Sequence, residues 1–525
     1  MTIQEKIAQG KTFLGIELGS TRIKATLTDD TFAPVASGSH EWENRLENGY
    51  WTYSLDDIHN GIRSCYADLK KDVSEKYGAV LTNIGAVGIS AMMHGYMAFD
   101  KDDKLLVPFR TWRNTTTEAA AAELTKLFGF NIPQRWSIAH LYQAILNGEA
   151  HINDIAHITT LAAYIHWLLT GKRVIGVGDA SGMFPITDGN YDGAMLGKFT
   201  EAASAHGFKP DIKAILPEIM TAGENAGTIT EEGAKFLDPA GDLKAGIPVC
   251  PPEGDAGTGM AATNAVLPKT GNVSAGTSIF SMLVLEEQLK GVYPEIDIVT
   301  TPDGAPVAMV HCNNCCSELD AWVKLFDEFA KLAGHEIKRS EVYDILYNNS
   351  LKGDEDCGGV IAYNYLSGEP VTGVESGRPM YFREPDGKMN LANFFRAQIY
   401  SSVAALKSGM DILFEKEHVT ADQFTGHGGL FKTRGVAQQY LADALGTPVS
   451  VMKTAGEGGS WGMALLAAYM VCGEGKKLAD WLSEQVFVGM EKQTAQPAES
   501  GSRGFAGFMK RYNAGLAAEK KLGDV

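Results

Sequence analysis

The sequence predicts an α/β protein with two domains of similar plan. TFLGIELGSTRIKATLTD in the first half and TGNVSAGTSIFSMLVL in the second each show a strand, a turn of small residues and a second strand, which is the pattern of a β-hairpin. The turns lie at 19–21 and 276–278. A segment rich in Pro and Gly at 251–269 precedes the second hairpin and marks the predicted domain boundary. With 525 residues the chain is long enough to build separate cores.

The first half is predicted to follow the order strand, strand, strand, helix, strand. These elements cover 13–18, 23–28, 35–42, 56–77 and 84–89. Its strands are apolar along most of their length, which is typical of a mixed sheet in an α/β domain.

The second half begins the same order again and then closes with alternating strands and helices. We predict strands at 273–274, 280–285, 307–310, 423–425 and 449–452, and helices at 317–332, 391–416, 434–445 and 460–470. Residues 191–246 are predicted to be a helical insertion, 496–504 a loop and 508–522 an amphipathic end. We therefore expect domains at 1–264 and 265–525.

Composition narrows the classes of function. The 64 acidic and 46 basic residues give a net charge of −18, which argues against a nucleic-acid-binding surface and favours plain solubility. No apolar run approaches the ~18 residues of a membrane-spanning helix. The first residues, MTIQEKIAQGKTFLG, show no secretory signal, so we expect a cytoplasmic protein without a membrane partner.

The seven cysteines do not suggest a disulfide framework. Cys312, Cys315 and Cys316 form the one dense cluster. Cys312 and Cys315 have a spacing that zinc sites use, but no second ligand pair follows. The cluster is therefore interpreted as a strand running into a helix with small buried thiols.

Both hairpin turns offer groups that suit phosphate oxygens. Glycine lets the backbone approach a ligand closely, and the hydroxyls and main-chain N–H groups are donors. One such hairpin in each half suggests a duplicated architecture that holds a polyphosphate from both sides. The residues concerned are Gly19, Ser20, Thr21, Gly276, Thr277 and Ser278.

Together with the motifs below, these hairpins resemble those of the FGGY carbohydrate kinases, a branch of the actin, hexokinase and Hsp70 ATPase superfamily. The resemblance covers nearly the whole chain. It implies two actin-like (ribonuclease H-like) ATPase domains with a ligand cleft between them. It also implies that ATP with Mg²⁺ donates its γ-phosphoryl group to a sugar hydroxyl, with sugar recognition in the first domain and nucleotide binding in the second.

Asp255 is the predicted general base. It stands in Pro-Pro-Glu-Gly-Asp-Ala-Gly, where a tight turn meets a helix start that would fix the carboxylate and keep it ionised. By itself this pattern favours a simple N-cap. The match to the Gly-Asp-x-x-x-Gly element of the family favours a catalytic base that also contacts the substrate.

Glu17 is the predicted metal-binding residue. The family usually has Asp there, and the longer side chain of Glu changes the position of the metal or the number of its waters. Lys24, on the following strand, is expected either to reach a phosphate or to be a solvated lysine at a sheet edge.

The second domain carries a motif that resembles the adenosine site of the family. Gly428, Gly429 and Lys432 lie in GHGGLFKT between a predicted strand and helix, where glycines let the adenosine rest on the backbone. In the following EGGSWG, at 457–462, Trp461 is expected to pack in the core.

Sugar recognition is expected from two elements of the first domain. Met93-His94-Gly resembles an element of xylulokinases, and its His can hydrogen-bond a hydroxyl. Trp112 can stack on a sugar, and Arg113 offers a fork of donors, although Arg113 and Asn114 match neither xylulokinases nor ribulokinases. Residues 178–182 resemble a further xylulokinase segment, in which a pocket wall and a structural turn are equally favoured.

These observations predict an ATP- and Mg²⁺-dependent kinase of a ketopentose such as xylulose, with ribulose or another ketose or polyol as the alternative. A nucleotide-switch ATPase of the actin or Hsp70 type, and a sugar sensor without activity, are the rival classes. We expect a small-molecule sugar and ATP as ligands, no nucleic acid, and leave a homodimer open.

Overall fold

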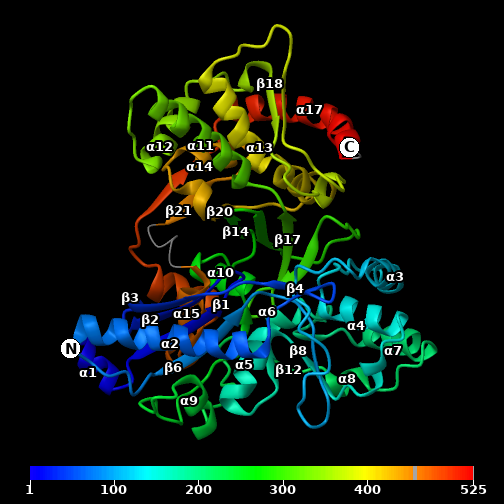
Figure 1. Cartoon of the computed structure of the whole chain (residues 1–525), viewed down its shortest axis with the longest axis vertical. Coiled ribbons are helices and arrows are strands. Elements are labelled where there is room, and N and C mark those ends of the chain that lie inside the picture. The colour runs from blue at the N-terminus through cyan, green and yellow to red at the C-terminus, as the bar shows by residue number, and fades with distance from the viewer. Residues whose placement is uncertain (453–457, 524–525) are drawn as a thin grey trace. The chain divides into compact units, whose positions relative to one another are not determined.

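The computed structural model describes residues 1–452 and 458–523 and confirms the α/β class (Figure 1). The chain forms two compact units, each assembled from separate stretches. Unit 1 comprises Met1–Leu267, Asp297–Val307 and Glu457–Val488. Unit 2 comprises Pro268–Ile296, Ala308–Gly456 and Gly489–Val525.

Unit 1 is built on a mixed sheet with the strand order β13-β6-β1-β2-β3. β1 pairs antiparallel with β2 and parallel with β6, and β6 pairs parallel with β13. The strands are β1 (Thr12–Leu18), β2 (Arg22–Asp29), β3 (Pro34–Glu41), β6 (Ala86–Ala91) and β13 (Glu253–Gly254). The predicted order of the first five elements is confirmed, with a small hairpin of β4 (Arg45–Glu47) and β5 (Tyr50–Thr52) added before the helix.

Two helices cover the two faces of this sheet (Figure 1). α2 (Leu55–Tyr77) packs on β2 and β3, and α15 (Gly458–Cys472) packs on β1 and β6. Glycines make the contacts close, since a Cβ on Gly15 would lie 2.0 Å from the Ser460 carbonyl oxygen and one on Gly38 would lie 2.3 Å from that of Cys65. Trp461 of α15 is buried, and its indole N–H donates to the Phe32 carbonyl at 2.9 Å, which confirms core packing.

The remaining elements of unit 1 surround this core. They are α1 (Ile3–Ala8), β7 (Met97–Phe99), α3 (Glu118–Phe128), α4 (Ser137–Leu146), β8 (His157–Thr159), α5 (Leu161–Thr170), β9 (Val174–Gly176), α6 (Val177–Ala180), β10 (Ile186–Thr187), β11 (Asn190–Tyr191), α7 (Gly193–Ala205), α8 (Ile212–Ile215), β12 (Glu218–Met220), α9 (Glu231–Leu237), α10 (Asp255–Ala262), β16 (Asp297–Thr300) and α16 (Leu478–Trp481). α7, α8 and α9 lie in the predicted helical insertion.

Unit 2 repeats the sheet plan of unit 1. Its strands run in the order β17-β15-β14-β20-β21-β22, and β14 again pairs antiparallel with its hairpin partner β15 and parallel with β20. β20 pairs parallel with β21, as β6 does with β13. The strands are β14 (Thr270–Ala275), β15 (Ile279–Val284), β17 (Pro306–Cys312), β20 (Gln423–His427), β21 (Val449–Met452) and β22 (Lys492–Ala495).

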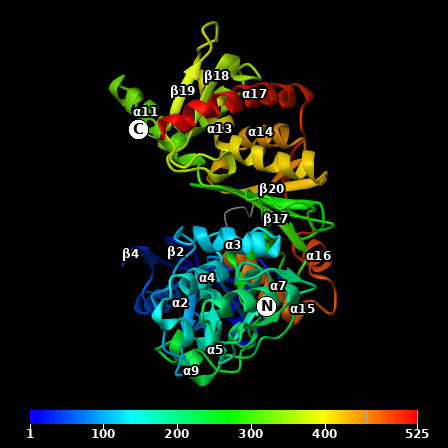
Figure 2. The ribbon, with the colours of Figure 1, turned by 90° about the vertical axis from the view of Figure 1, so that its right-hand side faces the viewer.

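Helices of unit 2 pack together beyond this sheet. Figure 2 shows α17 beside α13 and α14, in agreement with their contacts. The helices are α11 (Cys316–Leu332), α12 (Arg339–Ser350), α13 (Leu391–Asp411), α14 (Val436–Leu445) and α17 (Glu499–Leu522). Unit 2 also contains the strands β18 (Val360–Tyr363) and β19 (Met380–Arg383).

The loop predicted at 496–504 is wrong for most of its length, because α17 already begins at Glu499. Tertiary contacts with α14 explain the difference. The Asp443 carboxylate accepts the Ala498 N–H at 2.7 Å, and a Cβ on Gly501 would lie 2.1 Å from that carboxylate. The helix start is therefore set by a residue far away in the sequence. Glu457, the first residue of the EGGSWG motif, lies outside the described residues.

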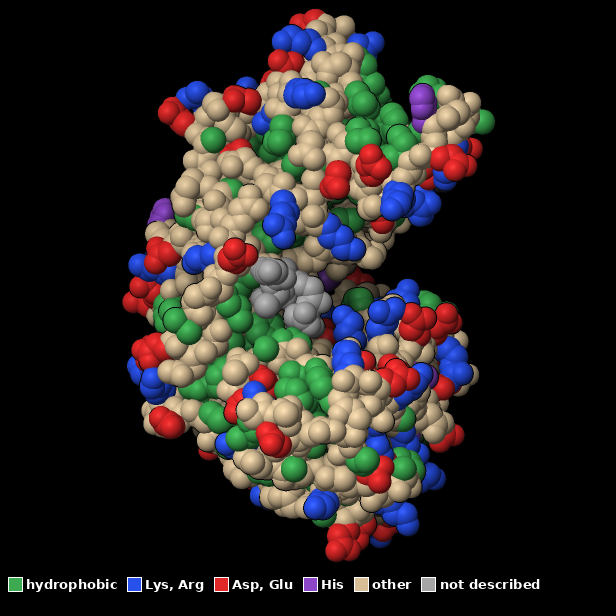
Figure 3. Space-filling model, turned by 90° about the vertical axis from the view of Figure 1, so that its left-hand side faces the viewer, with side chains coloured by type: hydrophobic (Ala, Val, Ile, Leu, Met, Phe, Trp, Pro, Cys, Tyr) green, Lys and Arg blue, Asp and Glu red, His purple; other side chains and the backbone are tan. Residues whose placement is uncertain are grey.

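The cysteine cluster is confirmed as the end of β17 and the beginning of α11, with Cys312 and Cys315 buried. Across residues 1–452 and 458–523, no group of three or more His, Cys, Asp or Glu side chains is arranged to hold a metal ion. No helix in that part of the chain combines the length and apolarity needed to cross a membrane. Acidic and basic side chains are interspersed over the face shown in Figure 3.

Candidate active site

The hairpin between β1 and β2 is fixed by aromatic side chains. The indole N–H of Trp42 donates to the Gly19 carbonyl at 2.7 Å, and the Tyr53 hydroxyl donates to the Ser20 carbonyl at 2.5 Å. The turn residues Gly19, Ser20 and Thr21 are at least partly exposed. These two hydrogen bonds hold the turn from the side of its carbonyl groups.

Glu17 and Lys24 occupy paired positions on β1 and β2. β2 lies between β1 and β3, so the alternative of a lysine at a sheet edge is wrong. Burial and the nearby charge of Asp255 raise the pKa of Glu17 to about 7, against the lowering effect of Lys24 and of a hydrogen bond from the Ser460 backbone. Glu17 as a residue is half-buried.

Asp255 begins α10 directly after the short strand β13. Its Oδ1 accepts the main-chain N–H of Met93 at 3.0 Å. The N-cap of α10 is Gly254, so the alternative of Asp255 as the N-cap is wrong. Burial raises the pKa of Asp255 to about 6, although main-chain hydrogen bonds from Met93 and Ala256 lower it. The expected effect of the helix start is therefore outweighed, and the group titrates close to neutral pH.

Two buried carboxyl groups lie close to Asp255 and were absent from the predicted site. Asp179 of α6 accepts the Thr160 hydroxyl at 2.5 Å through Oδ2, while Oδ1 is buried without a hydrogen-bond partner. Burial, and secondarily the charge of Asp255, raises the pKa of Asp179 to about 7. The sequence did contain a signal for Asp179, because residues 178–182 resemble a xylulokinase segment. The sequence alone favoured a pocket wall and a structural turn equally for this segment.

Glu253 is the fourth member of this acidic cluster. Burial and the charge of Asp179 raise its pKa to about 8, although main-chain N–H groups of Gly254, Asp179 and Gly178 donate to it. A Cβ on Gly178 would lie 2.4 Å from its Oε1. The carboxyl group therefore fills a space that glycine leaves open and joins α6 to β13. The position of Glu253 two residues before Asp255 was visible in the sequence, but the burial of its side chain was not.

The raised pKa values predict how stability depends on pH. A carboxyl group with a raised folded-state pKa stabilises the fold fully below its ordinary pKa, and this stabilisation is lost as pH rises through the folded pKa. For Glu17, Asp179 and Glu253 the loss extends to about pH 8. Burial lowers the pKa of histidines such as His140, in that case to about 3. These groups reduce stability only as pH falls below about 6.5, the ordinary pKa of histidine, so they do not affect the range above it. We therefore expect the melting temperature to fall between pH 6.5 and 8, measured by thermal unfolding.

The variant Glu253→Gln should reduce this fall, because the amide keeps an acceptor oxygen for the main-chain N–H groups and carries no charge. The exposed Glu43→Gln serves as the control and should leave the pH dependence unchanged. A melting temperature that rises over this range in the unaltered protein would contradict the assignment.

Two of the predicted sugar-binding residues, Met93 and His94, are held by different kinds of contact. Met93 contacts Asp255 through its backbone, whereas His94 is buried with its Nδ1 3.2 Å from the Gly182 carbonyl and its ring stacked on Trp136. His94 has a φ of 71°, in the left-handed region, so the turn holds it in a conformation that side chains seldom adopt.

The segment around Trp112 is tied to the first hairpin. The Trp112 indole N–H donates to the Ser20 hydroxyl at 3.2 Å. Arg113 is exposed, and its guanidinium lies 3.9 Å from the centre of the Trp51 ring. Asn114 is buried and exchanges hydrogen bonds with the Trp51 backbone at 2.8 and 2.9 Å. The unusual Asn114 thus holds the strand that carries Trp51, while Trp112 and Arg113 keep exposed surface.

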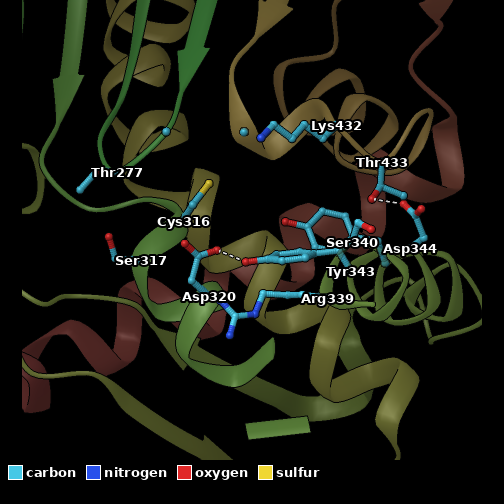
Figure 4. A pocket seen from close by; sticks show the side chains of 13 residues that line it. Thr277, Cys316, Ser317, Asp320, Arg339, Ser340, Tyr343, Asp344, Lys432 and Thr433 are labelled. Carbon is cyan, nitrogen blue, oxygen red and sulfur yellow. Dashed lines mark hydrogen bonds between the residues drawn. The ribbon is translucent and has the colours of Figure 1, made fainter. Parts of the chain in front are cut away.

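Unit 2 contains a pocket of about 540 Å³ that unites several predicted residues (Figure 4). Gly276 and Thr277 of the second hairpin line it together with Gly429 and Lys432. Ser278 and Gly428 do not line it. Gly428 has a φ of 101°, and a Cβ there would lie 2.3 Å from the Ala275 carbonyl oxygen, so it allows the two segments to approach.

Most of the pocket comes from residues that the sequence did not single out for this site. Tyr343 of α12 donates its hydroxyl to Asp320 of α11, and the Thr433 hydroxyl donates to Asp344 at 2.7 Å (Figure 4). The further lining residues are Cys316, Ser317, Arg339, Ser340 and Tyr347. The cations of Lys432 and Arg339 and the aromatic rings of Tyr343 and Tyr347 suit a ligand with a flat ring and an anionic end.

Comparison with known proteins identifies the family. Residues 12–261 match the N-terminal domain of the FGGY family of carbohydrate kinases, and residues 271–471 match its C-terminal domain. Xylulose kinase from Haemophilus influenzae is 22% identical over 443 residues, which cover 82% of this chain and 83% of that protein.

Solved structures show the same fold. Xylulose kinase from Rhodospirillum rubrum matches with a TM-score of 0.78 at 17% identity, covering 98% of this chain and 100% of the other. Glycerol kinase from Plasmodium falciparum, solved with ADP, matches with a TM-score of 0.74 at 17% identity, covering 97% and 98%. The chain therefore belongs to the FGGY family of carbohydrate kinases and is a phosphotransferase.

Proposed function

We propose that this kinase transfers the γ-phosphoryl group of ATP to a ketopentose of the xylulose type, with Asp255 as the general base. The observation that carries the proposal is the environment of Asp255. Its carboxylate is anchored by the Met93 N–H at 3.0 Å, the residue as a whole is half-buried, and the pKa of the carboxyl group is raised to about 6. A base with a pKa just below neutral pH is ionised and still basic enough to accept a hydroxyl proton.

The four clustered carboxyl groups divide into two kinds. Glu17 and Asp255 are partly exposed, whereas Asp179 and Glu253 are buried. Asp255 has the lowest of the four pKa values and is the first to ionise as pH rises. We assign the base to Asp255 and a positioning role to the buried pair, since groups whose pKa values are pushed apart take different roles.

In the proposed reaction, unit 1 binds the sugar and unit 2 binds the nucleotide. Asp255 accepts the proton of the attacking hydroxyl. Main-chain and hydroxyl donors of the two hairpins, with Lys24 and Lys432, hold phosphate oxygens, and His94, Trp112 and Arg113 orient the sugar. Little covalent assistance is needed, because phosphoryl transfer depends mainly on alignment and neutralisation of charge.

The residues present fit a magnesium ion at Glu17. The Asp255 charge raises the pKa of Glu17, so a cation there would relieve the repulsion between the two carboxylates. Mg²⁺ is usually held by only one or two protein carboxylates together with phosphate oxygens and water. When bound, it would neutralise charge on the phosphoryl group in transfer.

We expect Glu17→Gln to raise the Mg²⁺ concentration for half-maximal activity by about tenfold, since the amide is a weaker ligand for a hard cation. The measurement is ADP release at saturating ATP over a series of Mg²⁺ concentrations. Glu47→Gln, an exposed change in unit 1, is the control. An unchanged Mg²⁺ dependence would place the metal elsewhere.

The pKa of Asp255 also predicts the pH profile. Below about pH 6 the carboxyl group takes up a proton and cannot act as a base, so we expect kcat/KM to fall about tenfold per pH unit there. The profile is measured between pH 5 and 8 at low sugar concentration. A profile that stays flat down to pH 5 would exclude Asp255 as the base.

The substrate is tested by ADP release with MgATP and a panel of sugars. The panel contains xylulose, ribulose, other ketoses, polyols and aldonates. Xylulose should raise the rate by orders of magnitude over the sugar-free rate. A larger effect of ribulose or of a polyol would change the assigned substrate but leave the assigned phosphoryl transfer in place. No response to any sugar, with ADP still bound, would favour a nucleotide switch or a sensor.

A further inference from the structure

A pair of adjacent thiols lies at the wall of the unit 2 pocket. Cys315 is buried and precedes α11, while Cys316 begins the helix, is partly exposed and lines the pocket. Their Sγ atoms are 3.6 Å apart. Figure 4 shows Cys316 and Ser317 on the α11 side of this pocket, with Lys432 on another element.

The main chain of this pair holds the second hairpin. The Cys315 N–H donates to the Thr277 carbonyl and the Cys316 N–H donates to the Gly276 carbonyl, both at 3.0 Å. Gly276 and Thr277 line the same pocket as Cys316. Any movement of the peptide between the two cysteines therefore moves the donors that fix the hairpin.

The other side of the same peptide is also fixed. The Cys315 carbonyl accepts the Asn364 amide at 2.9 Å and the Ser402 hydroxyl at 3.2 Å. All four hydrogen bonds around this point thus join the thiol pair to main-chain or buried side-chain groups of unit 2. A chemical change at the pair cannot be absorbed without breaking some of them.

We propose that Cys315 and Cys316 form a redox-sensitive modification site whose oxidation to a vicinal disulfide weakens nucleotide binding in the unit 2 pocket. The proposal rests on the proposed function in one respect, namely that the ligand of this pocket is the nucleotide. The oxidant is hydrogen peroxide or another hydroperoxide.

The chemistry proceeds in two balanced steps. The Cys316 thiolate attacks a peroxide oxygen, the O–O bond breaks, and the departing hydroxide takes up a proton to give water and a sulfenic acid at Cys316. The Cys315 sulfur then attacks the Cys316 sulfur, the S–S bond forms and the S–O bond breaks, and water leaves with the Cys315 proton. Two thiols lose two electrons in total, and one peroxide is reduced to two waters.

Exposure decides the order of the two thiols. Cys316 faces the pocket, whereas Cys315 is buried, and burial raises the pKa of the Cys315 thiol well above its ordinary value. Cys316 is therefore the thiol that meets the oxidant, and Cys315 is the one that resolves the sulfenic acid.

Disulfide formation requires the backbone to move. The sulfur atoms must approach from 3.6 Å to about 2.05 Å. Adjacent Cα atoms are about 3.8 Å apart, whereas the Cα–Cα distance across a disulfide is usually at least about 4.4 Å. The connecting peptide must rearrange. Its N–H, that of Cys316, then leaves the Gly276 carbonyl, and the neighbouring Cys315 N–H leaves the Thr277 carbonyl. We expect ADP binding to weaken at least roughly tenfold, in line with the loss of two hydrogen bonds.

The test uses the whole reduced protein and measures ADP binding by calorimetry before and after treatment with a small excess of hydrogen peroxide. Mass spectrometry of the peptide that contains both cysteines should show the loss of two hydrogens. The affinity for ADP should fall with it and return after dithiothreitol. Cys315→Ser and Cys316→Ser should keep their affinity under peroxide, whereas Cys472→Ser, which removes another partly exposed thiol, should respond like the unaltered protein.

Three results would overturn the proposal. The first is a disulfide between the pair with unchanged ADP affinity, and the second is peroxide sensitivity that persists in Cys316→Ser. The third is a disulfide that joins Cys315 to Cys312 instead. The measurement on the unaltered protein does not depend on how the variants fold. If the reduced protein binds no ADP at all, the nucleotide assignment of the pocket fails, and the switch fails with it before any oxidant is added.

Discussion

Asp255→Asn is expected to reduce kcat by a factor on the order of 10² to 10⁴, the usual contribution of a general base. The change is nearly isosteric, and the Asn carbonyl can still accept the Met93 N–H that holds Asp255 at 3.0 Å. What is lost is the ability to accept a proton from the sugar hydroxyl. The measurement is ADP release at saturating sugar and MgATP.

Binding should survive this substitution. The affinities for ADP and for the sugar, measured by calorimetry, should stay within about threefold, because no donor or apolar contact is removed. The melting temperature should be equal or higher, since the Asp255 charge raises the pKa of both Glu17 and Asp179. Asp102→Asn, an exposed change in the same unit, is the control. Turnover close to normal in Asp255→Asn would rule out its role as the base.

Gly276→Val is expected to weaken nucleotide binding by about 10- to 100-fold, equivalent to about 1.4 to 2.8 kcal/mol. Gly276 does not have a positive φ, and a Cβ placed on it would meet no atom of the protein within 4 Å. The fold therefore does not require glycine at this position. Gly276 lines the pocket of unit 2, so an added side chain would occupy space in the pocket that we propose for the nucleotide.

Calorimetry with ADP measures this effect, and thermal unfolding provides the comparison. The melting temperature of Gly276→Val should stay close to that of the unaltered protein. Gly197→Val makes the same substitution at an exposed helical glycine that also has open space around it, and it should leave ADP binding unchanged. Unchanged ADP affinity in Gly276→Val would move the phosphate contacts away from this hairpin.

The two hairpins and the order of elements around them could be predicted from the sequence because their signals are local. Apolar residues before and after a small-residue turn predict β1–β2 and β14–β15 without knowledge of any distant contact. The structure confirms both hairpins and the parallel strand beside each, β6 and β20. The start of α17 was mispredicted because Asp443, a residue of another helix, fixes it.

The candidate site also contains residues that local sequence motifs predicted and residues that only tertiary contacts brought to it. Asp255, Gly276, Gly429 and Lys432 stand in short motifs that the sequence displays, and the three pocket residues among them do line one cavity. Asp179 and Glu253 stand in or beside motifs of the sequence, but a structural turn was equally favoured for the segment of Asp179, and the burial of Glu253 is not visible in its motif. Asp320 and Tyr343 were not assigned because carboxylates and tyrosines are common and their sequence neighbours carry no distinguishing pattern. Their roles arise from contacts between segments distant in the chain.

The sequence by itself determined the α/β class, the repeated hairpins, the family and the identity of the proposed base, since short-range patterns and motif spacing carry that information. Tertiary structure alone decided the electrostatics and most of the pocket wall. The pKa of Asp255 is raised to about 6 because burial outweighs the hydrogen bonds of its backbone neighbours. Burial depends on how distant segments pack, and no local pattern encodes it.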